Sequence, residues 1–524
     1  METTPCERET ETPTILICPE PGALCCITHQ RIMPGDVDML VYRFRERVQH
    51  IDSYWLSPTR KEEKLNKYRK EIASLAFDVL QRSLGAFIAN EIDIQLWTQC
   101  FYRLYAEKRA NLQAVGKEEI SAFIAMTNEG AEYYEYLIRV VSTISDRRRA
   151  ECIYPFYIHL GDIYRYKAGV TEKDDKTVWK KCESCYREAI QINPNNGNAF
   201  HQLAIVATQH RATCLALYYC IRAISCDRPF VTAFTNIAFH FERNKEELEK
   251  VKGLSFSLPR KQAVDFLSCH FIQLHALLSS NAPSAEFKSL SAHFQDSLQW
   301  CLEHDYAPAP LLFRMFVIHL FAAADSWRYL RDPNLEPACY LTPSCLIGWT
   351  LLFRFITAIM HFTAIPILPS KPHQLSLRHL PTLSLFFKWM DLQKEDHFRP
   401  SSYDHQPALL LKSLPIQEFE EAETAMWEEL KLMQKRLPCV EVYQEPSSSV
   451  LFFEKEVVGL RLFGDLFDDI PLDATVLTGK EAEKMYLHNI HTLCGKLLSR
   501  HHSLRGRKRE GGEDGRTAKK KCPS

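Results

Sequence analysis

Apolar residues recur at three- and four-residue spacing along most of the chain, the pattern of helices that bury one face. Nearly every segment between residues 36 and 248 has it, for example residues 37–51 and 120–144. It continues to about residue 500, interrupted by loops rich in Pro, Ser and His such as residues 366–374. Only 18 of 524 residues are Gly, which disfavours a β protein built on Gly turns. The chain is therefore predicted to be all-α.

Two stretches of the helical pattern repeat. Residues 185–190, CYREAI, recur as residues 220–224, CIRAI, with their alanines 34 residues apart. The helix before each stretch carries a small residue, Gly161 or Ala204, that permits close approach of a neighbouring helix. A period of 34 residues with these positions is the signature of tetratricopeptide repeats. We expect a pair of such hairpins here, with an insertion after the first helix.

The changes in composition predict four regions. Residues 1–35 are polar and acidic, which predicts disorder, and they lack the basic-then-apolar order of a secretory signal peptide. Residues 36–253 contain the repeats, and residues 254–500 are expected to form stacked helical hairpins without a repeat. Residues 501–524 have almost no apolar side chains and are expected to be a disordered basic tail.

Charge and cysteine content indicate which kinds of partner and which cellular compartment to expect. The 64 basic and 65 acidic side chains balance, so no general attraction to nucleic acid or membrane is expected. The 18 Cys are scattered, which suits a reducing compartment, and we expect a cytoplasmic protein. Residues 346–365 are apolar over the length of a bilayer, but Arg354 and His361 lie inside the stretch. A buried core helix is favoured over a membrane span.

The basic clusters of the tail, residues 505–509 and 519–521, leave two interpretations open. One is an ordinary solvated tail. The other is a nuclear-import signal or a contact to RNA phosphates, which would add shuttling to the nucleus.

A search for catalytic chemistry gives little. The sequence has no Gly-rich phosphate loop and no nucleophile elbow, so we predict no enzyme and no cofactor. Possible metal ligands occur in three groups, each of which has a more ordinary explanation in helix packing or an incomplete ligand set. They are Cys182 with Cys185; His488, His491 and Cys494; and Asp465, Asp468 and Asp469. We expect no metal site.

The run Arg165-Tyr166-Lys167 is the best candidate for a binding site. A guanidinium can fork onto a phosphate while a phenol donates a further hydrogen bond, which would suit a phosphoserine. The simpler interpretation is an ion pair between Arg165 and Asp162, three residues earlier on the same helix. Spacing alone favours the ion pair.

These segments together resemble the SMG/ever-shorter-telomeres family, whose members combine a 14-3-3-like, tetratricopeptide-built domain with a helical-hairpin domain. The family hallmark is Leu-Gly-Asp, two residues, Arg-Tyr, then a helix ending in Pro, then Gln-Leu-Ala. Matching positions here are Leu160, Gly161, Asp162, Arg165, Tyr166, Tyr186, Ala189, Pro194, Gln202, Leu203 and Ala204. Residues 96–104, 380–390, 453–466 and 493–498 add further similarity.

The resemblance implies an adaptor in nonsense-mediated mRNA decay. Family members bind the phosphorylated surveillance RNA helicase, pair with a related SMG protein as a heterodimer, and recruit decay enzymes and a type-2A protein phosphatase. Some carry a C-terminal PIN nuclease domain, but nothing after Leu498 offers its strands and acids, so nuclease activity is not expected. Two alternatives remain: a telomerase-associated factor that binds RNA through the tail, and a general tetratricopeptide scaffold for unphosphorylated peptides.

The family's phosphate pocket is only half retained. Arg165 and Tyr166 match its Arg-Tyr pair. Tyr102 stands at the position of its Lys, with Arg103 beside it, and His201 stands at the position of its Asn. Tyr at the Lys position is the pattern of the fifth SMG factor, which pairs with the seventh. The resemblance thus implies phosphoserine contacts from Arg165 and Tyr166, with Arg103 and His201 supporting them.

The family also pairs through helices of its first domain, near a Gly and an aromatic pair. Here Gly130 and Glu132 precede Tyr133 and Tyr134, with Tyr136 close by. A charge in a close-packed interface is costly unless it is paired. These tyrosines are therefore predicted to be either interface or core residues.

Overall fold

The computed structural model describes residues 34–111, 116–171, 176–251, 253, 259–280, 285–324, 342–364, 378–392, 415–437, 449–463, 467, 470 and 474–513. It divides into two compact units, Met1–Pro194 and Asn195–Ser524. Each unit is described by itself. This division between residues 194 and 195 does not test the domain boundary expected between residues 253 and 254, which stays a prediction.

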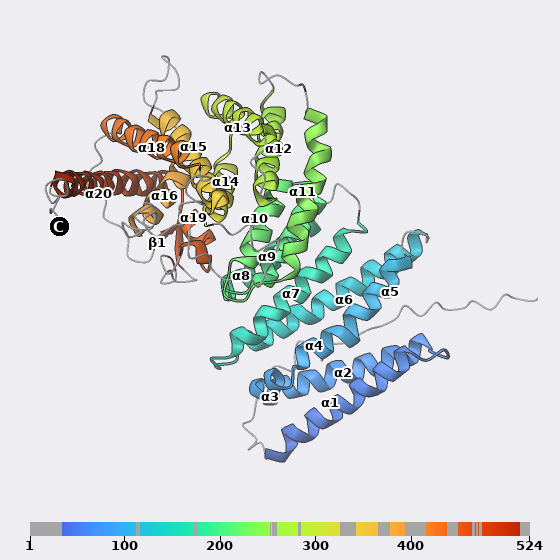
Figure 1. Cartoon of the computed structure of the whole chain (residues 1–524). Helices are drawn as coiled ribbons and strands as arrows, with labels where there is room; N and C mark the ends of the chain where they lie inside the picture. Colours follow the sequence, from blue (N-terminus) through green and yellow to red (C-terminus); the bar gives the residue numbers. More distant parts are fainter. Residues whose placement is uncertain are drawn as a thin grey trace, which may run out of the picture. The chain divides into compact units, whose positions relative to one another are not determined.

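The first unit is a bundle of helices that follow one another along the chain (Figure 1). In order they are α1 (Pro34–Trp55), α2 (Glu62–Arg82), α3 (Leu84–Ala89), α4 (Ile92–Leu96), η1 (Trp97–Tyr102), α5 (Arg103–Asn111), α6 (Lys117–Ser142), α7 (Arg149–Ala168) and α8 (Lys176–Ile192). Successive long helices pack side by side, α1 on α2, α6 on α7 and α7 on α8. Helical periodicity therefore predicted these elements well.

Aromatic side chains fill the centre of this bundle. Phe101, Tyr134 and Phe156, from three different helices, are at most 1% exposed, and the Phe101 and Tyr134 ring centroids are 5.2 Å apart. Rings of this size each bury large areas and dominate core energetics. The bundle is thus held by an aromatic core between η1, α6 and α7.

Between α4 and α5 the helix makes a turn of π-helix, η1. The continuous run from Ile92 to Asn111 therefore contains a local widening, a feature that is rare outside functional or strained sites. It changes the rotation of the residues that follow it. Tyr102 ends η1 and is 47% exposed.

The second unit continues the helical pattern and adds a small parallel sheet. Its helices are α9 (Gly197–Gln209), α10 (Thr213–Ile224), α11 (Thr232–Val251), α12 (Arg260–Ser279), α13 (Ala285–Glu303), α14 (Ala309–Ala323), α15 (Pro343–Ala364), α16 (Leu380–Leu392), α18 (Ile416–Arg436), α19 (Phe452–Glu456), η5 (Arg461–Phe463) and α20 (Gly479–Glu513). Strands β1 (Ser449–Leu451) and β2 (Thr475–Leu477) pair in parallel, with Val450 opposite Val476.

The small residues of the repeat lie where backbones or rings approach closely. A Cβ on Gly161 would lie 2.5 Å from Cε1 of Tyr186 in the α7–α8 hairpin. In the α9–α10 hairpin, a Cβ on Gly197 would lie 2.1 Å from the carbonyl oxygen of Ala223. Ala204 is 1% exposed. Each hairpin therefore has the close helix approach expected from the repeat pattern.

Helix α15 is the apolar stretch that matches a bilayer in length. It is the one helix among the described residues that is long and apolar enough to span a membrane, and 56% of its apolar window is buried inside the protein. It packs against α13, α14 and α18, and Phe355, Ile356 and Ile359 are fully buried. The structure therefore places it as a core helix of the second unit.

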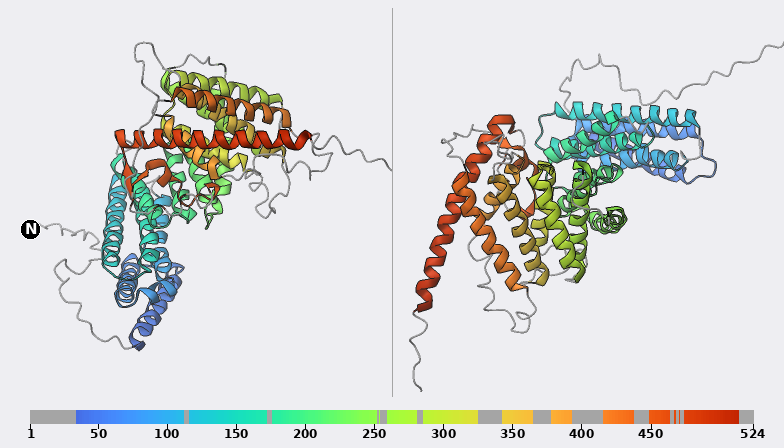
Figure 2. Two further views of the ribbon diagram at one scale, coloured as in Figure 1. Left: turned by 90° about the vertical axis from the view of Figure 1, so that its left-hand side faces the viewer. Right: turned by 90° about the horizontal axis from the view of Figure 1, so that it is seen from above.

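Helix α20 is the longest element, a 35-residue rod that packs on α16 and α18 (Figure 2). Near its C-terminal end, His501 is 2% exposed and stacks on Trp427 with ring centroids 4.1 Å apart. The helix continues beyond it to Glu513 and includes residues 505–509, the first cluster of the tail that the sequence predicts to be disordered from residue 501. Arg and Lys are good helix formers, which suits this extension.

Candidate functional site

Arg165, near the end of α7, is held by two neighbours. Its Nη2 donates to Oδ1 of Asp162 at 2.8 Å, and its Nε donates to the hydroxyl of Tyr186 on α8 at 3.2 Å. The Tyr186 hydroxyl in turn donates to the same Asp162 oxygen at 2.6 Å. Asp162 and Tyr186 are both buried. The ion pair that spacing alone favours is therefore present, and Tyr186 completes it.

Two guanidinium groups lie against the ring of Tyr166. The Arg165 Cζ is 4.7 Å from the ring centroid, and the Cζ of Arg109, at the end of α5, is 4.4 Å from it. Tyr166 itself is 6% exposed, and Arg109 is exposed. Both distances are within the range of cation–π attraction. α5 and α7 thus bring two positive charges together over one phenol.

Arg109 did not emerge from the sequence as a site residue. It lies seven residues after Tyr102, about two helical turns on, so the two positions share a face of a regular helix. That spacing is the one feature of the sequence that could have indicated Arg109. It became visible only in the structure, because the side chain reaches Tyr166 from a different helix.

Burial shapes the electrostatics of this site. Burial raises the pKa of the Tyr166 hydroxyl to about 12, Asp162 adds to the rise, and Arg165 and Arg109 oppose it. Burial alone would lower the pKa of Arg165, but Asp162, Tyr186 and Tyr166 outweigh it and raise the pKa. At neutral pH Tyr166 is therefore a neutral hydrogen-bond donor, and Arg165 remains charged.

The remaining predicted residues of the first unit point elsewhere. Arg103 pairs with Asp52 of α1 at 2.5 Å and also donates to Gln99 at 3.0 Å. Tyr102 packs near Trp97, with ring centroids 6.4 Å apart. No described contact joins Arg103 to Arg165 or Tyr166. A supporting role for Arg103 at the phosphate would require it to leave Asp52.

His201 belongs to the second unit, on α9. Its ring stacks on Phe230 with centroids 4.4 Å apart, and its Nε2 is 2.9 Å from Nδ2 of Asn236 on α11. It is 6% exposed. These contacts give His201 a packing role within its own unit, and its part in a phosphate site stays a prediction.

The tyrosines of α6 belong mainly to the core. Tyr133 donates to the carbonyl oxygen of Ala73 at 3.1 Å and is 7% exposed, and Tyr134 is fully buried. Tyr136 is half-buried and lies 5.4 Å from Phe77, centroid to centroid. Glu132 is exposed. Of the two interpretations left open by the sequence, the core is the one that Tyr133 and Tyr134 follow.

Within the described ranges, no group of three or more His, Cys, Asp or Glu could hold a metal ion. Cys182 and Cys185 are buried in the α7–α8 hairpin, and burial raises the pKa of both thiols, which opposes the thiolate form that metals bind. Cys494 is likewise fully buried. The candidate acids Asp465, Asp468 and Asp469 lie outside the described residues.

A comparison with protein families adds the decisive observation. The model of the family described as "Est1 DNA/RNA binding domain" matches residues 182–456, just over half of the chain. The chain belongs to the SMG/Est1 family. The resemblance derived from the hallmark residues is thereby confirmed.

Curated relatives within the SMG/Est1 family match shorter regions. A "Nonsense-mediated mRNA decay factor SMG7-like" of Arabidopsis thaliana is 29% identical over 165 residues, covering 30% of this chain and 19% of the relative. The "Nonsense-mediated mRNA decay factor SMG7" of the same plant is 36% identical over 95 residues, covering 18% and 9%. A "Nonsense-mediated mRNA decay factor SMG5" of Danio rerio is 29% identical over 126 residues, covering 23% of this chain and 11% of the relative. The chain thus spans less than a fifth of the length of these relatives.

A solved structure supports the fold. The chain superposes on one from "Crystal structure of Est1 and Cdc13" with a TM-score of 0.63 and 12% identity, covering 88% of this chain and 96% of that one. This likeness concerns the fold alone. The helical, 14-3-3-like fold class predicted from the sequence is confirmed.

Proposed function

We propose that this SMG/Est1 chain is a non-enzymatic adaptor in nonsense-mediated mRNA decay that binds a phosphoserine segment of the surveillance RNA helicase. Support comes from the relatives, which include SMG7 and SMG5 factors of that process. The observation that carries the binding step is the convergence of Arg109 and Arg165 on Tyr166.

The contacts of Arg165 leave it able to bind a phosphate. A guanidinium has five N–H donors. One on Nε is used by Tyr186 and one on Nη2 by Asp162, so three remain. Because these two neighbours fix the orientation of the guanidinium, little side-chain entropy is lost when a ligand binds. The ion pair with Asp162, which was the simpler alternative to a phosphate site, therefore preorganises the Arg165 guanidinium for binding.

Net charge limits the affinity of this site. Arg109 and Arg165 supply two positive charges, and Asp162 supplies one negative charge within hydrogen-bond distance of Arg165. A hydrogen bond to a charged group contributes about 1.5–3 kcal/mol, so a few contacts give weak binding by themselves. We therefore propose that the chain works as a heterodimer with a related SMG protein, where two linked sites raise the avidity. Recruitment of a type-2A phosphatase belongs to the same proposal.

The test uses the full chain and synthetic helicase peptides with and without phosphoserine, measured by fluorescence anisotropy. We expect the phosphopeptide to bind and Arg109→Glu to weaken it by tenfold or more, about 1.4 kcal/mol. Arg165→Glu should do the same, but it also disturbs a buried contact, so the exposed Arg109 is the cleaner variant. Lys180→Glu, an exposed change on α8, is the matched control and should leave binding unchanged.

Two outcomes contradict the proposal. Equal affinity for phosphorylated and unphosphorylated peptides would make the chain a general peptide scaffold. Loss of binding in Arg103→Glu with full binding in Arg109→Glu would move the site to the residue that the sequence favoured.

A second candidate function rests on the family description and on a relative named "Telomerase-binding protein EST1A" in Danio rerio, 21% identical over 215 residues. Under this alternative the chain binds RNA through the basic cluster at residues 505–509 and acts with telomerase. Removal of residues 503–524 should then abolish RNA retention and leave phosphopeptide binding intact. Cytoplasmic residence with import through the same cluster is proposed on the same basis.

A further inference from the structure

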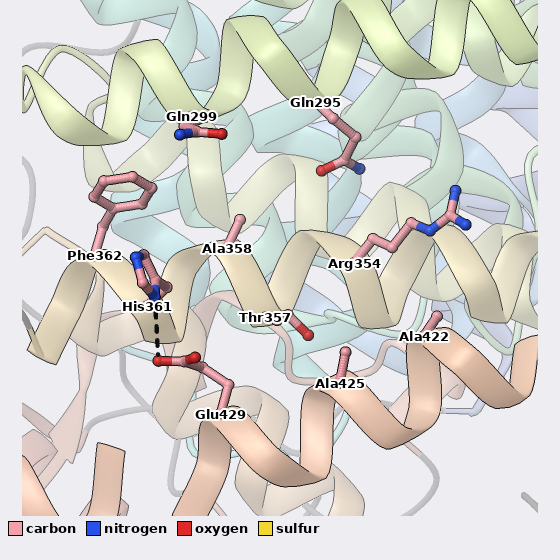
Figure 3. A pocket seen from close by; sticks show the side chains of 10 residues that line it. All are labelled: Gln295, Gln299, Arg354, Thr357, Ala358, His361, Phe362, Ala422, Ala425 and Glu429. Atoms are coloured by element: carbon pink, nitrogen blue, oxygen red, sulfur yellow. Dashed lines mark ion pairs between the residues drawn. The ribbon is translucent and has the colours of Figure 1, made fainter. Parts of the chain in front are cut away.

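A groove separate from the phosphate site lies on the second unit, between α13, α15 and α18 (Figure 3). Its volume is about 320 Å³, within the range of ligand pockets. Figure 3 shows Gln295 reaching down from α13, Arg354 at one end of the α15 segment and His361 at the other, with Ala422, Ala425 and Glu429 on the α18 side. All of these residues belong to one compact unit.

The guanidinium of Arg354 is the unusual feature of this groove. It lies in the middle of α15, whose neighbours Phe353 and Phe355 are buried core residues. It is half-buried and makes no hydrogen bond or ion pair with any described residue. None of its nitrogens is among the buried atoms that lack a partner, so the charge is open to solvent and to a ligand. An anionic group from outside can pair with it directly.

A second unpaired donor lies in the same groove. The side-chain amide nitrogen of Gln295 is buried and has no hydrogen-bond partner among the described residues. One guanidinium with a neutral amide donor matches the single charge and two oxygens of a carboxylate. A phosphate dianion would be left with half of its charge unbalanced. The groove therefore favours an Asp or Glu side chain.

The other end of the groove presents an acceptor. One oxygen of Glu429 lies 3.4 Å from Nδ1 of His361 and 3.5 Å from Nη1 of Arg436, yet it is buried without a hydrogen bond. Arg354 and His361 are seven residues apart, about 10.5 Å along the helix axis. An extended peptide covers that distance in about three residues. Glu429 can thus accept an N–H from a peptide whose acidic side chain lies on Arg354.

The floor between the two ends is made of small side chains. Ala422 is 3% exposed, and Ala425, one turn along α18, is exposed to solvent. Small residues leave room for a backbone to lie close to the helices. The groove is therefore shaped for a main chain with one anchoring side chain.

We infer that this groove is a docking site for an acidic peptide of a partner protein, bound in extended form. The peptide's carboxylate pairs with Arg354 and Gln295, its backbone lies over Ala422 and Ala425, and an N–H about three residues away donates to Glu429. The groove shares no residue with the proposed phosphoserine site on α7, so the two binding events can be tested separately.

The experiment uses the full chain and pools of nine-residue, end-capped peptides with a fixed central residue and randomised small or apolar flanks. The central residue is Glu, Gln, Lys or phosphoserine, and binding is measured by fluorescence anisotropy up to millimolar peptide. We expect the Glu pool to bind and the Gln and Lys pools to bind at least tenfold more weakly. Arg354→Gln should remove this preference, and the exposed Arg260→Gln on α12 is its matched control.

A second variant tests the groove without changing Arg354, so that a folding defect in Arg354→Gln does not decide the result. Ala425→Phe fills the groove from an exposed position, so it should weaken the Glu pool at least tenfold, and the neighbouring exposed Thr424→Phe should not. Three results would overturn the inference: no saturable binding of the Glu pool, equal binding by wild type and Arg354→Gln, or a preference for phosphoserine. A dimer in size-exclusion chromatography that Ala425→Phe dissociates would also overturn it, because a second copy would then occupy the groove.

Discussion

Gly161 and its neighbour Asp162 show how closely packing and charge are linked at the scale of single residues. The absent side chain of Gly161 lets the Tyr186 ring approach α7, and the approach brings the Tyr186 hydroxyl onto Asp162. The pairing of Asp162 with Arg165 could be predicted from their three-residue spacing. The role of Tyr186 could not, since it depends on how the α7–α8 hairpin closes.

A glycine pair tests this arrangement. Gly161→Ala would place a Cβ 2.5 Å from the Tyr186 ring, and we expect a loss of about 1–3 kcal/mol in the free energy of unfolding. Gly169→Ala is the control, because its nearest atom would be 3.6 Å away and its φ of −67° suits alanine. Urea unfolding followed by circular dichroism measures both. Equal effects would show that the contact with Tyr186 is unimportant.

The candidate site divides in the same way between what the sequence specified and what it did not. Arg165 and Tyr166 are adjacent in the chain, so a motif could point to them. Arg109 and Asp52 are far from them in sequence. Only the tertiary arrangement of the helices decides that Arg109 reaches Tyr166 of α7 while Arg103 pairs with Asp52 of α1. Long side chains on one helix choose their partners from other helices, and periodicity carries no information on that choice.

At the scale of elements, hydrogen bonds and an ion pair join the segment around η5 to the C-terminal end of α10. Arg222 of α10, 1% exposed, donates from Nη2 to the carbonyl oxygen of Val458 at 2.9 Å and lies 4.3 Å from the centre of the Phe200 ring. Nearby, the Arg461 backbone N–H donates to the Ser225 carbonyl oxygen at 2.9 Å, and its Nε pairs with Asp227 at 2.9 Å. Contacts that span more than 230 residues thus close the second unit.

Substitution of the buried Arg222 by Ala should lower the free energy of unfolding far more than the same substitution of the exposed Arg461. Arg222→Ala leaves a cavity and an unsatisfied carbonyl group, and we expect a loss of about 3–5 kcal/mol in the free energy of unfolding. Arg222→Met keeps most of the volume and should lose about 0–2 kcal/mol, since Nε and Nη1 of Arg222 have no partners among the described residues. Arg461→Ala removes an exposed pair worth about 0–1 kcal/mol. Urea unfolding measures all three variants. If Arg222→Met and Arg222→Ala lowered the free energy of unfolding equally, the hydrogen bond to Val458, and not the volume of the side chain, would stabilise the segment.

Across the whole molecule, several histidines are buried as neutral rings. Burial lowers the pKa of His159 and His275 to about 3. Burial, helped by Arg243 and Arg378 respectively, lowers the pKa of His240 and His379 to about 4. An unfolded His titrates near 6.5, so below that pH the unfolded chain binds protons that the folded chain excludes. Stability should therefore fall as the pH drops from about 6.5 towards 4.

Three acids among the described residues oppose this trend. Burial raises the pKa of Asp93 and of Asp265 above the usual aspartate value. Burial raises the pKa of Glu129 to about 7, so in the folded chain it takes up a proton between pH 7 and its unfolded value of 4.5. That uptake adds stability as the pH falls through this window. Burial also lowers the pKa of His270 and of His319, so six His outweigh three acids and the net effect is destabilising. The expected result is a melting temperature that decreases steadily from pH 6.5 to pH 4.5.

His159→Phe isolates one contribution. The ring of His159 stacks on Trp97 with centroids 4.5 Å apart, and both of its nitrogens are buried without partners among the described residues, so Phe should be tolerated at pH 7. Below pH 6 the variant should gain stability over the wild type by up to about 1.4 kcal/mol per pH unit. Thermal melts from pH 7 to 4.5 measure the gain, with the exposed His50→Phe as control. Parallel melting curves for His159→Phe and wild type would contradict the burial argument.

The order in which α15 and α18 are made has a consequence for biosynthesis. The 72 residues 365–436 must be translated after α15 before its partner α18 is complete, which takes roughly 4 to 14 seconds at about 5–20 residues per second. During that interval the face of α15 that α18 covers is exposed, on an apolar helix of the length that a bilayer accepts. Arg354 near its middle adds about 2.5–3.5 kcal/mol to the free energy of insertion. The same arginine that lines the groove therefore disfavours insertion of the nascent helix into a bilayer.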